Sequence, residues 1–235
     1  MASQADSRIR EVGGPVRSVN RANLYAGRNK AGEPCIYGTM SQQAENFFLL
    51  QINPETGAFR QMSPEVPESN YTTAVYASPT GRLYIGAAHS GHLYCFDPDE
   101  DALLDLGTIN GKNAIFPCRI DEDSKGLIWV SSYGTADLTS YNPKTCEFTR
   151  YGRMDETDMY AHCYVNTDDT IAVMITQTQP HVVVLDPKTG EKKTVGPVVQ
   201  KGEGTLSLHR GSDGKLYIDS SEGNFRIDGM EAVPV

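Results

Sequence analysis

A two-residue turn signal recurs through the chain at a nearly constant interval. Asn or Asp followed by Pro stands at positions 53, 97, 142 and 186, and Asp228-Gly229 continues the series, giving intervals of 44, 45, 44 and 42 residues. Each pair closes a short apolar run. Pro at the second position fixes φ, and the Asx side chain before it can accept hydrogen bonds from the following backbone. The repeat therefore predicts tight turns between antiparallel strands.

A second polar turn precedes most of these pairs and leads into a strand rich in β-branched and aromatic residues. It is found in 78–86, 122–130, 166–173 and 211–218. Four short strands that recur every 42–47 residues are typical of a β-propeller blade. A mostly helical fold is excluded because no ten-residue stretch keeps a helical apolar period without Gly, Pro or β-branched runs.

We therefore predict an all-β fold, a single β-propeller domain over residues 1–235 with about five four-stranded blades. The expected blades are 14–65, 66–109, 110–154, 155–199 and 200–235. Two arrangements are open: a closed five-blade ring, or part of a larger propeller. An open arc is expected to leave two apolar blade faces exposed, because each blade depends on its neighbours to bury its faces.

Composition narrows the class of partner. Asp and Glu outnumber Lys and Arg by 30 to 21, a net charge of −9 that disfavours nucleic acid as a partner. No apolar run is long enough for a membrane helix, and the first residues contain no intact secretory signal. We expect a cytoplasmic protein, or a secreted one whose signal has been removed. The five cysteines lack metal-site spacing, and four are expected to be buried thiols: Cys35, Cys95, Cys118 and Cys163.

Two stretches carry a family resemblance. Residues 126–132 (Gly-Leu-Ile-Trp-Val-Ser-Ser), with 140–145 (Ser-Tyr-Asn-Pro-Lys-Thr), resemble the blades of streptogramin B lyase-like propellers. Residues 160–164 through 181–190 are similar to blades of propeller polysaccharide lyases that act on uronates. The similarity runs along 66–228 and is mostly blade grammar, which lactonase-like and purely scaffolding propellers share.

The resemblance implies a carbon–oxygen lyase that works by β-elimination, with a divalent cation (Mg, Ca or Mn) and a histidine at the start of an inner strand. His162 occupies that position. The family's acidic metal ligand just before the histidine is not matched, because residue 160 is Tyr. The nearest carboxylates, which are the candidate cation ligands, are Asp155, Glu156 and Asp158.

Aligning the blades predicts which side chains gather at the mouth of the channel. Thr73, Cys118 and His162 fall at one level of the inner strands, and Tyr71, Phe116 and Tyr160 fall nearer the mouth. We predict His162 as a base, with Tyr160 and Tyr71 as acid or base. The predicted substrate-binding residues are Arg21, Asn70, His89, His92, Tyr133 and Gln177.

Amides and aromatic rings suit an oligosaccharide or another small ligand, such as a cyclic ester, and Arg21 could pair with a substrate carboxylate. The acidic surface weighs against a uronate polymer. The alternative for the same residues is a non-catalytic propeller that binds a ligand or a protein, with the rings filling the channel. Missing blades supplied from elsewhere are a third kind of partner.

Overall fold

The computed structural model describes residues 21–41, 46–65, 71–111 and 115–235, and these form twenty β-strands in five antiparallel sheets. Each sheet contains four strands that are consecutive in sequence and adjacent in space. This is a β-propeller arrangement with five blades, as the repeat predicted. Among the described residues, no helix is long and apolar enough to cross a membrane.

The strands have the following bounds. Blade 1 contains β1 (Arg21–Arg28), β2 (Pro34–Ser41), β3 (Phe48–Ile52) and β4 (Phe59–Met62). Blade 2 contains β5 (Thr72–Ala77), β6 (Leu83–Ala87), β7 (His92–Asp97) and β8 (Ala102–Thr108). Blade 3 contains β9 (Phe116–Glu122), β10 (Ile128–Tyr133), β11 (Asp137–Asn142) and β12 (Glu147–Arg153). Blade 4 contains β13 (Ala161–Val165), β14 (Ile171–Ile175), β15 (His181–Leu185) and β16 (Lys192–Val195). Blade 5 contains β17 (Leu206–Arg210), β18 (Leu216–Ser220), β19 (Gly223–Asp228) and β20 (Glu231–Pro234).

The repeated Asx-Pro pairs form the turns between third and fourth strands. In each of the first four blades the Asx Oδ1 accepts a hydrogen bond from the amide two residues further on, at 2.9–3.0 Å. These side chains are Asn53, Asp97, Asn142 and Asp186. The local bonds hold the turn without any tertiary contact, which is why the turns could be predicted from the sequence.

Apolar clusters join each blade to the next. Tyr37 and Leu49 of blade 1 pack on Phe96 of blade 2, and equivalent clusters join blades 2 and 3, blades 3 and 4, and blades 4 and 5. Middle strands such as β6, β10 and β15 are almost wholly buried because both faces of their sheet are covered. The continuous apolar runs follow from this burial on two sides.

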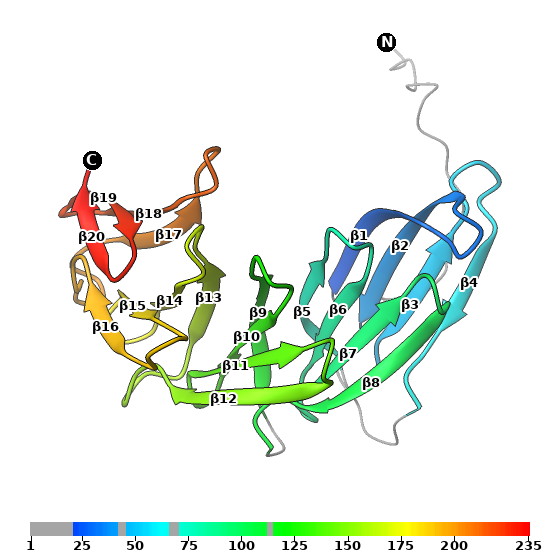
Figure 1. The fold of residues 1–235 in the computed structure, drawn as a ribbon, viewed down its shortest axis with the longest axis horizontal. Coiled ribbons are helices and arrows are strands. Elements are labelled where there is room, and N and C mark those ends of the chain that lie inside the picture. The colour runs from blue at the N-terminus through cyan, green and yellow to red at the C-terminus, as the bar shows by residue number, and fades with distance from the viewer. Residues whose placement is uncertain (1–20, 42–45, 66–70, 112–114) are drawn as a thin grey trace, which may run out of the picture.

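The five blades form an open arc (Figure 1), with blade 1 and blade 5 at its two ends. No apolar cluster of the described residues joins blade 5 back to blade 1. The closed five-blade ring, one of the two arrangements left open by the sequence, is therefore wrong for this structure. Three of the four cysteines that were predicted to be buried are so, namely Cys35, Cys95 and Cys163, whereas Cys118 is only half-buried because it lines an inner strand.

Candidate functional site: an aromatic basin

Two kinds of loop meet on one side of the arc. The amide of Ala88, in the loop between β6 and β7, donates to the carbonyl of Tyr71, which leads into β5 (2.9 Å). Between neighbouring blades, the amide of Gly134 donates to the carbonyl of Met159 (3.1 Å), and Tyr133 and Tyr160 form an antiparallel bridge. These backbone bonds bring residues from separate blades to one basin.

The basin has a volume of about 380 Å³ and is lined by residues of blades 2, 3 and 4. Its lining residues are Tyr71, Thr73, Phe116, Pro117, Cys118, Tyr133, Tyr160 and His162. Small-molecule sites commonly have volumes of about 300–1,000 Å³ and mostly apolar walls. By size and composition the basin falls within that class.

Five rings form a continuous row along the basin. The ring centroids of Tyr71 and His89 lie 5.4 Å apart, and those of His89 and Phe116 lie 5.2 Å apart. The ring centroids of Phe116 and Tyr133 lie 5.4 Å apart, and Tyr133 stacks on Tyr160 with their centroids 4.2 Å apart. These separations are typical of attractive aromatic pairs, so the rings hold one another in place.

His162 is the titratable group of the basin with the most useful chemistry. It lies on the inner strand β13, opposite Met174 of β14. Burial, and then the positive charge of Arg119, lowers the pKa of His162, so the imidazole is neutral near pH 7. Arg119 itself stacks on the ring of Tyr164, with its Cζ 3.9 Å from the centroid. A neutral imidazole has one ring nitrogen free to accept a proton.

Two other titratable groups of the basin, Tyr160 and Cys118, are held in their protonated forms. Partial burial and the neighbouring Tyr133 raise the pKa of Tyr160, so its phenol is a hydrogen-bond donor and not a base at neutral pH. Burial raises the pKa of the Cys118 thiol to about 11, which disfavours the thiolate needed for nucleophilic attack. Of the two roles predicted for Tyr160, the raised pKa disfavours the base and leaves the phenol as a hydrogen-bond donor.

The basin also presents hydroxyl groups but no formal charge. The Thr73 hydroxyl oxygen is buried and has no hydrogen-bond partner among the described residues. None of the eight lining residues is Lys, Arg, Asp or Glu. An unpartnered buried hydroxyl is costly, so the packing around Thr73 carries a desolvation penalty.

The predicted site residues divide into two groups. His162, Tyr160, Tyr71 and Tyr133 line the basin, and His89 contacts two of its rings. His92 lies elsewhere, with its Nδ1 2.9 Å from Asp105 Oδ1, and it does not line the basin. Gln177 is half-buried in the loop between β14 and β15 and also lies outside the lining. For Arg21 only the backbone in β1 is described, and Asn70 lies outside the described residues.

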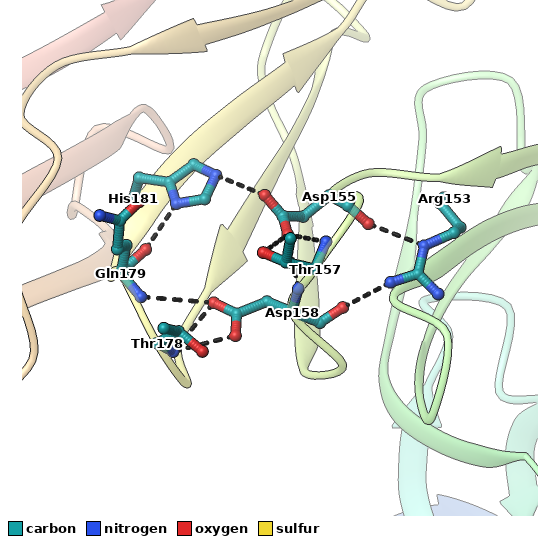
Figure 2. Close-up of polar contacts among 7 residues, drawn as sticks. All are labelled: Arg153, Asp155, Thr157, Asp158, Thr178, Gln179 and His181. Atoms are coloured by element: carbon teal, nitrogen blue, oxygen red, sulfur yellow. Dashed lines mark hydrogen bonds and ion pairs between the residues drawn. The ribbon is translucent and has the colours of Figure 1, made fainter.

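The three candidate cation ligands occupy one loop, in which the carboxylates of Asp155 and Asp158 are already engaged (Figure 2). Both carboxylate oxygens of Asp158 accept the amide of Thr178, at 2.9 and 3.0 Å. Asp155 Oδ1 accepts the amides of Thr157 and Asp158, and its Oδ2 lies 3.4 Å from His181 Nε2. The third candidate, Glu156, is exposed.

These contacts tie the loop before β13 to the loop between β14 and β15. Arg153 adds to this by donating to the carbonyls of Asp155 and Asp158, both at 2.9 Å (Figure 2). The donor set is thus used in fastening one loop to another, and it does not fit the cation implied by the resemblance. Within the described ranges, no group of three or more His, Cys, Asp or Glu side chains is arranged to hold a metal ion.

Sequence reasoning did not select Phe116 or Thr73 as site residues, although the blade alignment placed both at the right level. Phe116 contacts three other rings of the row and is therefore central to the basin. The alignment of Phe116 with Tyr71 and Tyr160 on neighbouring blades was the sequence feature that could have indicated this role. The unpartnered hydroxyl of Thr73 depends on packing and carried no sequence signal.

Comparison with known proteins supports the fold. No family model matches the sequence, and no curated protein matches it. Among solved structures the chain is similar to virginiamycin B lyase from Staphylococcus aureus, with 12% identity and a TM-score of 0.62, over 88% of this chain and 71% of that one. A gluconolactonase-like propeller protein matches with 10% identity and a TM-score of 0.54, over 92% and 78% of the two chains.

The extracellular domain of a hybrid two-component system from B. thetaiotaomicron matches with 16% identity and a TM-score of 0.53, over 93% of this chain and 26% of that one. The resemblance to streptogramin B lyase-like propellers is thereby confirmed at the level of the fold. A lyase, a gluconolactonase-like protein and the extracellular domain of a two-component system all match this fold, so activity has to be argued from the basin.

Proposed function

We propose that the aromatic basin binds one uncharged ring of a small ligand, and that His162 removes a proton from it in a β-elimination. The observation that carries the proposal is the neutral imidazole of His162, which lines a basin whose Cys118 thiol and Tyr160 phenol stay protonated. Aromatic walls suit the apolar face of a sugar or lactone ring.

The charge of the lining selects the substrate class. A uronate carboxylate would meet no Lys or Arg among the eight lining residues, and the chain as a whole carries a net charge of −9. Burying an unpaired carboxylate is strongly unfavourable. The proposed ligand is therefore neutral where it enters the basin.

The protonation states favour a cyclic ester over a glycoside. In a β-elimination His162 takes the proton from the carbon next to a carbonyl. The electron pair of that C–H bond forms the C=C bond, and the C–O bond at the β-carbon breaks. If the leaving oxygen belongs to an ester, it departs as a carboxylate and needs no proton. A sugar alkoxide would need an acid, and the raised pKa of Tyr160 makes that phenol a poor one.

Binding without turnover is the second candidate function. It is favoured by the lack of a charged group in the lining that could stabilise the enolate formed when the proton is removed. The same five-ring row would serve a purely binding site.

One experiment separates the two candidates. The wild type is incubated with a macrocyclic peptide lactone and with neutral oligosaccharides, and products are followed by liquid chromatography and mass spectrometry. Elimination opens the lactone to an unsaturated isomer of unchanged mass, whereas hydrolysis adds one water. We expect His162→Gln to lower turnover about 10²–10⁴-fold.

The matched control is His92→Gln, the same substitution at a histidine outside the basin. It should leave turnover unchanged. Full activity in His162→Gln would remove this residue from the mechanism. A ligand that raises the melting temperature of both variants and of the wild type, with no product in any, would establish the binding function instead.

A further inference from the structure

Arg119 lies on β9, directly after the basin residue Cys118, and its guanidinium donates to no acceptor within the described part of the chain. Its Nε is buried without a hydrogen-bond partner there, while the side chain as a whole is half-buried. Every other arginine whose side chain is described donates to a carboxylate or a carbonyl, namely Arg28, Arg60, Arg82, Arg150, Arg153, Arg210 and Arg226. Arg119 is the exception among them.

The ring of Tyr164 holds this guanidinium in position. Arg119 Cζ lies 3.9 Å from the centroid of Tyr164, which is a cation–π contact. Arg119 is paired across the sheet with Ser131, whose hydroxyl accepts the amide of Cys163 at 3.0 Å, so this face of blade 3 is turned toward blade 4. A guanidinium that lies over a ring keeps its N–H groups in its own plane, where a carboxylate can accept two of them at once.

The cation is close to the proposed base. His162 and Tyr164 are the two half-buried residues of β13 and alternate with buried ones, so they share one face of the strand. Two residues of a strand span about 6.6 Å, which places the ring that carries Arg119 one such step deeper along β13 than His162. The charge of Arg119, after burial, lowers the pKa of His162, as expected of a cation near the imidazole.

The carboxylates that follow on β9 do not neutralise Arg119. Asp121 Oδ2 already accepts Arg210 Nη2 at 2.8 Å and the amide of Val165 at 2.9 Å. Glu122 lines a separate pocket between blades 2 and 3. One positive charge is therefore left uncompensated next to the basin, although the chain as a whole carries a net charge of −9. A fixed guanidinium with unused donors is the usual means by which a protein recognises a carboxylate.

We propose that Arg119 forms a carboxylate subsite next to the basin, and that the group it receives is the carboxylate released when an ester is eliminated. The subsite rests on the basin being a ligand site, and the identity of its occupant rests on the proposed elimination. The ring held among the aromatic side chains stays neutral, in agreement with the uncharged lining. The anion forms beyond that ring, on the side of Arg119.

The charges of this step balance. His162 gains the proton, the electron pair of the C–H bond forms the C=C bond, and the pair of the β-carbon C–O bond stays on the leaving carboxylate. A cation fixed where that negative charge develops stabilises the transition state. The same carboxylate offsets the positive charge of Arg119, which otherwise disfavours the imidazolium that forms on His162.

A pair of probes tests the subsite without any turnover. 3-Phenylpropionate and 3-phenylpropionamide share a ring and a two-carbon tether and differ in charge, and calorimetry measures the affinity of each. The wild type should bind the carboxylate about 10-fold more tightly, against the trend set by the net charge of the chain. Arg119→Gln should lose this preference and keep the affinity for the amide, which also shows that its basin is intact. Arg119→Lys, which keeps the charge, should retain part of the preference.

The matched control is Arg226→Gln, the same substitution at an arginine of blade 5 that pairs with Asp228. It should bind both probes as the wild type does. With a macrocyclic peptide lactone as substrate, Arg119→Gln should lower kcat about 10–100-fold and leave KM nearly unchanged, because the intact lactone carries no carboxylate for the subsite.

The two assays separate failure of the subsite from failure of the elimination. Equal affinity of the wild type for the two probes, a preference that persists in Arg119→Gln, or no binding of either probe would overturn the subsite. A preference that depends on Arg119 in a protein that leaves the lactone intact would establish the subsite and reject the elimination. A raised KM with unchanged kcat in Arg119→Gln would overturn the leaving-group role, because Arg119 would then recognise the intact substrate.

Discussion

One arginine connects three blades, and its removal should lower stability by a predictable amount. Arg210 of β17 donates from Nη2 to Asp121 Oδ2 of β9 and to the carbonyl of Val165 of β13, both at 2.8 Å. The same Asp121 oxygen accepts the amide of Val165 at 2.9 Å. Blades 3, 4 and 5 therefore meet at a single charged contact. Asp121 is buried, with its side chain 11% exposed, while that of Arg210 is 38% exposed.

The perturbation is Arg210→Met, which keeps much of the aliphatic stem and removes the charge. A hydrogen bond to a charged group contributes about 1.5–3 kcal/mol, and breaking a fully buried pair costs about 3–5 kcal/mol. Because Arg210 is partly exposed, solvent screens the pair, and we expect a loss of about 2–3 kcal/mol. With an unfolding entropy of about 2.1 cal/mol/K per residue over 235 residues, the melting temperature should fall by about 5 °C.

Thermal and urea unfolding of the wild type, Arg210→Met, Asp121→Asn and the double variant complete a cycle that isolates the pairwise energy. Arg226→Met is the control, because its partner Asp228 is exposed and the pair lies on the outward face of blade 5. Removing this exposed pair should leave the melting temperature and the urea midpoint nearly unchanged, because solvent screens it. A loss at Arg210 no larger than that at Arg226 would refute the reasoning.

Three further outcomes are expected. Cys146 is exposed and has a positive φ of 58°, at a turn position where blades 1 and 4 carry Gly57 and Gly190. Because glycine adopts positive φ without strain, Cys146→Gly should raise the free energy of unfolding measured in urea by about 1 kcal/mol. The control Thr145→Gly should not raise it. Because the pKa of His162 is lowered on folding, the unfolded chain binds more protons below about pH 6.5, so this residue's contribution to stability is lost as pH falls through that range. If His162 is the base, the rate of turnover should fall only when the pH is lowered below 6.5. A rate that already falls on lowering the pH above 6.5 would contradict the lowered pKa.

Local chemistry explains why most of the fold could be predicted from the sequence. The Asx-Pro turns are held by side chains bonding to their own backbone, as Asn53 and Asp186 show, so the repeat could be identified without any long-range contact. The blade alignment then placed His162, Tyr160 and Tyr71 together, because equivalent positions on inner strands meet at one side of a propeller.

The sequence of blade 5 itself indicates that one face of its sheet lies in water. In blade 4, Ile171–Ile175 and His181–Leu185 are nearly continuous apolar runs, as a sheet covered on both faces requires. In blade 5, Leu206–Arg210 and Leu216–Ser220 alternate between apolar and polar residues, which is the pattern of a strand with one face in water. What could not be predicted is pairing over distance, such as Arg210 with Asp121, 89 residues apart.

The basin is built without any residue of the two end blades. All eight lining residues come from blades 2, 3 and 4, and each of these is packed against a blade on both sides. The stacked rings of Tyr133 and Tyr160 bridge blades 3 and 4, whereas Arg210 reaches blade 3 from blade 5 at the far end of β9. Loosening blade 5 with Arg210→Met should therefore lower the melting temperature while leaving binding in the basin intact. If ligand affinity fell together with stability, the basin would depend on the whole arc, and the three central blades would not form a self-sufficient site.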